Sequence, residues 1–251
     1  FAAEKELPFM LIGQGSNLLF RENYPGVILE MNILGKKIID EDGDNVLVKA
    51  RCGENWHAFV QWCLGNTCYG LENLSLIPGN IGAAPVQNIG AYGVELCEVM
   101  ESLEAVEIST GQLKTFSNAD CRFSYRSSVF KEELRDQYVI YSVSFRLSRK
   151  AEVKVDYASL ANALEELSAE EVTPELVSKV VCDIRRSKLP NPGRLGNAGS
   201  FFWNPVISTE DFSRLQKNFP DIVSYPQGDK VKLAAAWLIE QAGWKGFREG
   251  D

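Results

Sequence analysis

The residues best placed to bind an anion in this chain are glycines, which lie in two segments without a charged side chain. Leu11–Phe20 reads L-I-G-Q-G-S-N-L-L-F and predicts a strand followed by a glycine-rich turn. Ile77–Gly93 reads I-P-G-N-I-G-A-A-P-V-Q-N-I-G-A-Y-G, and its prolines and glycines argue against both a regular helix and a strand. Because glycine lets bare backbone N–H groups approach a ligand, the two segments predict a pyrophosphate held by main-chain dipoles in a mostly apolar cleft.

Three further side chains could contribute to binding or catalysis. Arg126 lies between serines in Cys121–Lys131 and offers a fork of donors that suits a carboxylate, although a surface arginine in a turn is the alternative. Ser200 lies in Gly196–Pro205, where permissive backbone meets apolar residues, and a buried structural turn is the alternative. Lys188 follows a predicted helix and could meet a phosphate, although an isolated lysine is more often a solvated surface residue.

Composition limits the classes of protein and partner. With 251 residues, 45% of them hydrophobic, the chain can form two modest domains or one large one. The net charge of −8 argues against a nucleic acid, which requires a basic face, whereas a small anion can still bind locally. The longest apolar run near the C-terminus, Leu233–Ile239, is too short to cross a bilayer. We therefore expect neither a nucleic acid nor a membrane as a partner.

Cysteine and histidine usage argues against a metal site. The six cysteines form no C-x-x-C pair and predict buried or neutral thiols in a reducing cytosol, so we expect a cytoplasmic protein. His57 is the only histidine, which makes zinc improbable, and no metal is predicted. His57 lies in an amphipathic helical pattern and is expected to be a helix-surface residue rather than the base of a serine triad.

The chain has a strand-rich half and a helix-rich half, which predicts an α+β fold with a boundary near Lys150. Strands are predicted at Gly26–Met31, Val46–Ala50, Leu103–Ile108, Gln112–Phe116 and Tyr138–Leu147. Helices are predicted at Trp56–Leu64, Tyr157–Leu167, Pro174–Ser187, Phe212–Phe219 and Lys232–Ala242. Asn118 and Thr173 are predicted N-caps, and turns are predicted at Asp42–Gly43 and Thr110–Gly111.

Four motifs occur in an order that is specific to one family. They read G-Q-G-S-N, then G-L-E-N-L-S-L-I-P-G-N-I-G-A-A-P-V-Q-N-I-G-A-Y-G-V-E, then C-R-F-S-Y-R-S-S-V-F-K, then N-A-G-S-F-F-W-N-P. From about Leu11 to Gly246 the chain resembles the UDP-N-acetylenolpyruvoylglucosamine reductase (MurB) family. The D-Y-A-S-L segment, Asp156–Leu160, resembles the subtype with a tyrosine-bearing loop over the substrate.

The resemblance implies a fold, a cofactor and a reaction. The fold is a two-lobed FAD-binding domain of the vanillyl-alcohol-oxidase (PCMH) type over residues 1–150, with an α+β substrate-binding domain over 151–251. By analogy NADPH reduces the flavin, and a hydride then passes to UDP-N-acetylglucosamine enolpyruvate. The product is UDP-N-acetylmuramate, a precursor of peptidoglycan, so the implied processes are cell wall biogenesis, cell shape and cell division. A monomer is expected.

The resemblance also implies roles for individual residues. Arg126 would hold the substrate carboxylate, and Ser200 would donate a proton to the adjacent carbon. The flavin contacts would come from Gly13, Gln14, Gly15, Ser16, Asn17, Pro78, Gly79, Gly82, Ala83, Gln87, Asn88, Gly90, Ala91, Tyr92 and Gly93. The contacts to the nucleotide sugar would come from Tyr125, Tyr157, Lys188, Asn204, Tyr225 and Lys245.

One departure from the family and two alternatives remain open. The family has an active-site glutamate near its C-terminus, and no glutamate before Asp251 matches it, so a molecule limited to these residues is expected to be a poor catalyst. The first alternative is another flavin oxidoreductase on the same FAD domain, although a covalent histidyl flavin is excluded because the first glycine-rich loop has no histidine. The second is a catalytically incomplete UDP-sugar-binding module.

Overall fold

The computed structural model describes residues 5–250, which divide into two compact units. The first unit ends at Asn197 and the second begins at Ala198. The predicted boundary near Lys150 falls inside the first unit, between a long strand and the helix that follows it. As a division between cofactor and substrate roles, that boundary stays a prediction.

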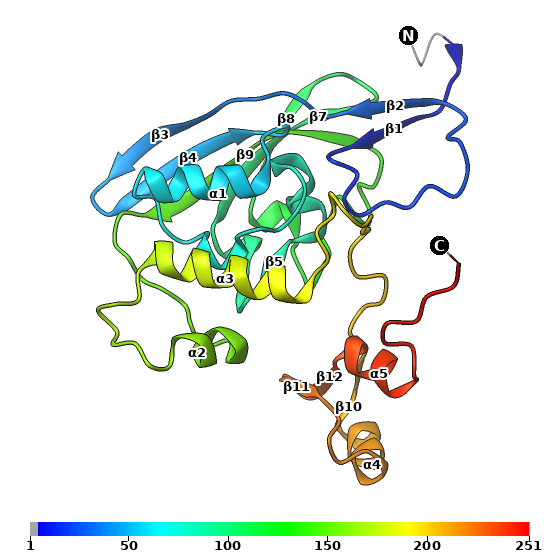
Figure 1. Ribbon diagram of the computed structural model, residues 1–251. Coiled ribbons are helices and arrows are strands. Elements are labelled where there is room, and N and C mark those ends of the chain that lie inside the picture. Colours follow the sequence, from blue (N-terminus) through cyan, green and yellow to red (C-terminus); the bar gives the residue numbers. More distant parts are fainter. Residues whose placement is uncertain (1–4, 251) are drawn as a thin grey trace. The chain divides into compact units, whose positions relative to one another are not determined.

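A five-stranded antiparallel sheet forms one layer of the first unit (Figure 1). Its order is β3 (Lys36–Asp42), β4 (Asn45–Arg51), β9 (Tyr138–Ser148), β7 (Met100–Glu107) and β8 (Leu113–Ser117). Strand β4 illustrates why this sequence forms a sheet, because the buried Val46, Val48 and Ala50 alternate with the half-buried Leu47 and Lys49. The predicted turns at Asp42–Gly43 and Thr110–Gly111 connect β3 to β4 and β7 to β8, and both glycines have positive φ.

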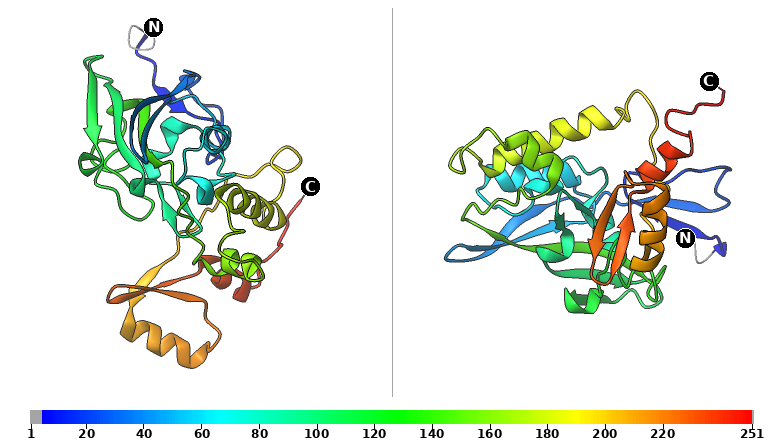
Figure 2. Two further views of the ribbon diagram at one scale, coloured as in Figure 1. Left: turned by 90° about the vertical axis from the view of Figure 1, so that its left-hand side faces the viewer. Right: turned by 90° about the horizontal axis from the view of Figure 1, so that it is seen from below.

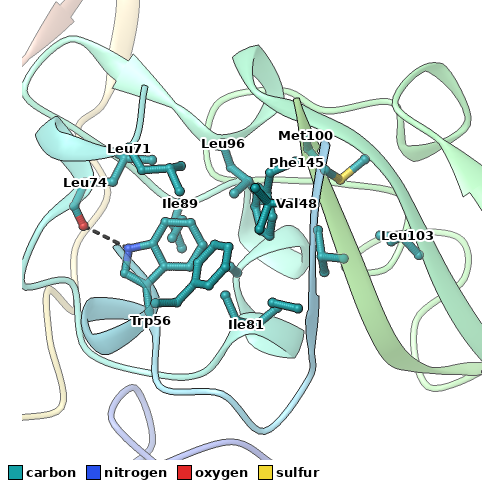
Figure 3. Close-up of a cluster of buried hydrophobic side chains, with 14 of the residues drawn as sticks. Val48, Trp56, Leu71, Leu74, Ile81, Ile89, Leu96, Met100, Leu103 and Phe145 are labelled. Carbon is teal, nitrogen blue, oxygen red and sulfur yellow. Dashed lines mark hydrogen bonds between the residues drawn. The ribbon is translucent and has the colours of Figure 1, made fainter. Parts of the chain in front are cut away.

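Helix α1 (Trp56–Gly65) packs its apolar face into the main core. Asn55 caps the helix by accepting the backbone N–H of Ala58 at 2.9 Å. Trp56 is buried against Phe145 of β9, and its indole N–H donates to the carbonyl oxygen of Leu74 at 2.8 Å (Figure 3). This bond ties the helix to the chain that precedes the glycine-rich segment.

Short elements surround the glycine-rich segments. Strands β1 (Phe9–Ile12) and β2 (Val27–Glu30) form a separate parallel pair. Ile77–Gly93 is irregular as predicted, with 3₁₀ turns and only the two-residue strand β5 (Gly90–Ala91), which pairs with β6 (Val94–Glu95). The 3₁₀ turns of this unit span Glu72–Leu74, Ile81–Ala83, Pro85–Gln87, Leu96–Glu98 and Ala119–Cys121.

Helices α2 (Ala158–Leu164) and α3 (Pro174–Lys188) form a second, smaller apolar cluster. Thr173 caps α3 as predicted, because its side chain accepts from the backbone N–H of Leu176. On the same helix, Ser178 is buried and hydrogen-bonds to Ser75 at 2.7 Å. Helix α3 is therefore fixed against the segment that leads into the glycine-rich stretch.

The second unit has a three-stranded antiparallel sheet in the order β10 (Val206–Ser208), β12 (Lys230–Leu233) and β11 (Ser224–Gln227). Helix α4 (Thr209–Asn218) contacts β10 and β12, and α5 (Ala235–Gln241) follows β12 (Figure 2). The prediction of one helix over Lys232–Ala242 was partly wrong, because its first residues complete β12.

Two other local predictions concern Asn118 and the cysteines. Asn118 was predicted to cap a turn, but its side-chain amide instead donates to the carbonyl oxygens of Cys97 and Met100. All six cysteines are free thiols, and all except the half-buried Cys97 are buried. Burial raises the pKa of Cys121 to about 12, which keeps that thiol protonated. Among residues 5–250, no helix is long and apolar enough to span a bilayer.

Candidate active site

The two glycine-rich segments lie against each other. The side-chain oxygen of Gln14 accepts the backbone N–H of Gly79 at 3.3 Å. A methyl group built on Gly13 would lie 3.6 Å from Asn80, and one built on Gly79 would lie 3.5 Å from the Ser16 hydroxyl. Segments that are more than sixty residues apart in the sequence thus share one surface, as a site made from both requires.

This surface carries polar groups that have no partner within the described residues. The backbone N–H groups of Gln14 to Asn17 donate no hydrogen bond there. Asn80 donates from its side-chain nitrogen to the carbonyl oxygen of Met31 at 3.1 Å, whereas its buried Oδ1 has no partner. An unpaired buried oxygen is unusual in a folded protein, and a donor group of a ligand or an ordered water can complete it.

These residues fit FAD. Successive N–H groups in a glycine turn suit a pyrophosphate, and the orphan oxygen of Asn80 suits a hydroxyl or ring N–H. Gly79 is buried with φ of 112°, and a methyl group on Gly82 would lie 2.6 Å from Cβ of Cys52. Neither position therefore tolerates a larger residue, and the bare backbone beside the cradle is preserved.

Arg126 occupies a tight turn next to the second glycine-rich segment. Ser124 and Ser127 exchange backbone hydrogen bonds across the turn, and Arg126 adopts the left-handed conformation with φ of 55°. Its guanidinium donates to the carbonyl oxygen of Asn88 at 3.3 Å and of Gly90 at 2.5 Å. Two carbonyls of Ile77–Gly93 thus fix the orientation of the guanidinium.

Glu95 and Asn88 support this arrangement. Glu95 Oε1 lies 3.8 Å from Nη1 of Arg126, and Oε2 of Glu95 accepts the side-chain N–H of Asn88 at 2.9 Å. Asn88 is fully buried, and its Oδ1 accepts the backbone N–H of Cys97. Both ends of the Asn88 amide are therefore used inside the protein. Its nitrogen also donates to the carbonyl oxygen of Ser124 at 3.1 Å, which holds the turn that carries the arginine.

A pocket of about 270 Å³ opens beside Ala91 and Tyr92. Its other lining residues are Tyr157, Ser159, Arg185, Lys188 and Leu189. The rings of Tyr92 and Tyr157 meet edge to face with their centroids 5.4 Å apart, and the buried hydroxyl of Ser159 has no hydrogen-bond partner among residues 5–250. Two cationic side chains, two phenols and an orphan hydroxyl suit a phosphate-bearing ligand. Of the predicted substrate residues, the pocket thus brings together Tyr157 and Lys188.

Tyr125, which precedes Arg126 in the turn, is half-buried, and its ring centroid lies 5.3 Å from the guanidinium carbon of Arg126. The aromatic face therefore adds a second surface that orients the guanidinium. Of the predicted substrate residues, Tyr125 therefore lies in the turn of Arg126 and is not among the residues that line the pocket.

The other predicted site residues belong to the second unit. Ser200 is exposed in irregular chain before β10, directly after Gly199, which has φ of 81°. The Oδ1 of Asn204 accepts the first backbone N–H of α5, from Ala235, at 2.9 Å. Tyr225 is exposed on β11, and Lys245 pairs with Glu240 after α5.

The match to a known domain first defines a class. Residues 1–117 match the model of the FAD binding domain, and residues 191–251 match that of the UDP-N-acetylenolpyruvoylglucosamine reductase C-terminal domain. A cradle of backbone N–H groups in the first region and a separate unit in the second agree with these matches. The fold and the site therefore define an FAD-dependent oxidoreductase with a two-part architecture.

Relatives then identify the family. The UDP-N-acetylenolpyruvoylglucosamine reductase of Pseudomonas putida is 49% identical over 100% of this chain and 74% of its own length. That of Pseudomonas aeruginosa is 50% identical over 99% of this chain and 74% of its own length. The chain belongs to the UDP-N-acetylenolpyruvoylglucosamine reductase family. The crystal structure of the enzyme from Thermus caldophilus has the same fold, with a TM-score of 0.60 and 21% identity over 99% of this chain and 71% of that one.

Sequence reasoning missed three residues of this site. Arg185 precedes Lys188 by three positions, so both lie on one face of α3, and that spacing was a usable signal. The orphan oxygens of Asn80 and Ser159 left no such signal. Their importance follows from burial, which depends on chain segments that are distant in the sequence.

Proposed function

We propose that this chain binds FAD and uses NADPH to reduce UDP-N-acetylglucosamine enolpyruvate to UDP-N-acetylmuramate. The single observation that carries the proposal is the contact of Arg126 with the carbonyls of Asn88 and Gly90, in the same glycine-rich segment whose Gly79 is hydrogen-bonded to Gln14 of the backbone cradle. An arginine that is fixed next to a flavin site can hold a carboxylate there. The identity of about half the residues with named reductases supports the same substrate.

In the proposed reaction, the protein binds two anions and moves one proton. Bound FAD supplies the hydride. The N–H groups of Gln14–Asn17 hold the pyrophosphate of the cofactor, and the Oδ1 of Asn80 accepts one of its hydroxyl or N–H groups. Arg126 holds the substrate carboxylate and stabilises the negative charge that develops beside it, a contribution of about 3 kcal/mol for one preorganised donor.

Ser200 donates its hydroxyl proton to the carbon next to that carboxylate. A serine hydroxyl is a weak acid, so the transfer requires that the developing carbanion and the hydroxyl are held in place without competing water. Proton donation by Ser200 completes the lactyl ether.

The pocket beside Tyr92 binds the nucleotide part of the substrate in this proposal. Lys188 and Arg185 offset the charge of the diphosphate, and Tyr157 covers it, as expected for the subtype with a tyrosine-bearing loop. Asn204, Tyr225 and Lys245 add contacts from the second unit. We further propose that the protein acts as a cytoplasmic monomer in peptidoglycan synthesis, and thus in cell shape and division.

Replacing Gly15 with alanine tests the cradle. Gly15→Ala places a methyl group among the backbone donors, and we expect FAD to bind about 10- to 100-fold more weakly, the equivalent of one lost hydrogen bond to a charged group. The affinity is measured by titrating the apoprotein with FAD and following flavin fluorescence. Gly43→Ala is the matched control, because Gly43 has a similar φ of 57° to the 67° of Gly15, and a methyl group meets no atom within 4 Å at either position. Equal effects of the two substitutions, or a chain that binds no FAD, would contradict the proposal.

A further inference from the structure

The residue that precedes the second glycine-rich segment has an unusual backbone conformation. Leu76 has φ of 58°, in the left-handed region that leucine rarely occupies, and it lies immediately before Ile77–Gly93. The direction of the backbone at Leu76 therefore determines where Ile77–Gly93 begins. A conformation that the local sequence disfavours persists only when surrounding contacts hold it.

Two distant helices hold the peptide groups of Leu76. Nδ1 of His57, on α1, accepts the backbone N–H of Leu76 at 3.0 Å. Nε of Arg185, on α3, donates to the carbonyl oxygen of Leu76 at 3.1 Å. His57 is thus not the helix-surface residue that its sequence pattern predicted, since it is half-buried and its imidazole has a defined acceptor role.

This contact requires the neutral imidazole. A protonated ring carries N–H on both nitrogens, so Nδ1 would then oppose the N–H of Leu76 as a second donor. Among the described residues, the charged groups that act on His57 are the guanidinium groups of Arg186 and Arg185 on α3. Burial first, and then these two charges, lower the pKa of His57, so the acceptor form dominates at neutral pH.

We propose that His57 is a positioning residue, which fixes the Leu76 peptide through Nδ1 and thereby holds Ile77–Gly93 in the conformation that receives the cofactor. The inference rests on the proposed function in one respect, namely that this segment contacts FAD. A role of His57 in packing alone would not make FAD affinity depend on pH. Because the imidazole titrates, FAD affinity falls on acidification when the His57 contact is lost.

NMR spectroscopy tests the contact itself, without a cofactor. The chain has a single histidine, so its imidazole resonances need no discrimination from others. We expect His57 to titrate with a midpoint below its ordinary value of 6.5, and the amide resonance of Leu76 to shift with the same midpoint. A Leu76 amide that does not respond while His57 titrates overturns the proposal.

FAD titrations of variants test the consequence. For the wild type, we expect affinity to fall by up to about tenfold per pH unit below the His57 midpoint, the limit for coupling to one proton. His57→Asn places a carbonyl oxygen near the position of Nδ1 but cannot titrate, so it should bind FAD without that pH dependence. His57→Phe removes the acceptor and should bind about tenfold more weakly at all pH values, in line with one lost hydrogen bond. Glycine adopts the left-handed conformation without strain, so adding Leu76→Gly to the His57→Phe variant should restore its FAD affinity.

These variants distinguish a failure of the His57 contact from a failure of the proposed function. If His57→Asn loses affinity on acidification as the wild type does, another group is responsible and the proposal is overturned. The same holds if His57→Phe binds as tightly as the wild type. If the wild type binds no FAD near neutral pH, the proposed function fails instead, and the NMR titration alone decides whether His57 holds Leu76.

Discussion

Ser200→Ala is expected to slow reduction of the enolpyruvyl substrate by about 10²- to 10⁴-fold, the usual contribution of a positioned general acid. Bleaching of the flavin by NADPH should keep its wild-type rate, because that step needs no proton from Ser200. The hydroxyl lies in exposed irregular chain, so its loss should not unfold the second unit. Single-turnover stopped-flow absorbance measures the two half-reactions separately.

Ser213→Ala provides the control for this experiment. Ser213 is an exposed serine of the same unit, and its hydroxyl donates to the carbonyl oxygen of Thr209 within α4. We expect both half-reactions of this variant to match the wild type. If Ser200→Ala slowed both half-reactions equally, Ser200 would not be the proton donor.

Arg126→Lys should reduce turnover by about 10²-fold, corresponding to the loss of a preorganised donor worth about 3 kcal/mol. Lysine keeps the positive charge, but its single ammonium cannot reproduce the planar fork that contacts Asn88, Gly90 and the substrate carboxylate together. The loss should appear in the substrate half-reaction, measured in the same stopped-flow assay, with FAD affinity little changed.

Arg122→Lys is a matched control four residues away. Arg122 is also in the left-handed region, with φ of 43°, and pairs with Glu133 on the exposed side of the same segment. Backbone strain is therefore equivalent in the two variants, and only the guanidinium beside Gly90 differs in function. Near-normal turnover of Arg126→Lys, or equal losses in both variants, would mean that the arginine fork is structural.

Local sequence patterns predicted the elements in which the spacing of apolar residues alone shows which side chains are buried. The alternation in Val46–Ala50 predicted β4, and Thr173 followed by Pro174 predicted the start of α3. Strand β3, K-K-I-I-D-E-D, was missed because its charges resemble a loop, although an edge strand tolerates and even favours them. The first residues of Lys232–Ala242 were assigned to a helix because nothing local indicated that they pair with β10 and β11.

In the candidate site, too, residues with a local sequence signal were predicted and residues placed by tertiary contacts were not. Glycine-rich backbone and Arg126 were visible as motifs, since their chemistry depends on neighbouring residues in the sequence. The supporting contacts of Glu95, His57 and Arg185 were not visible, because each joins elements that are distant in the chain. Tertiary packing, rather than local propensity, gives these side chains their roles.

Anaerobic stopped-flow absorbance of the FAD-loaded full-length protein tests the central claim most directly. The protein is mixed first with NADPH and then with UDP-N-acetylglucosamine enolpyruvate. The proposal predicts that flavin absorbance disappears in the first step and returns in the second, with one UDP-N-acetylmuramate formed for each flavin. A flavin that NADPH bleaches but that the enolpyruvyl nucleotide leaves reduced, while oxygen restores its absorbance, would contradict it.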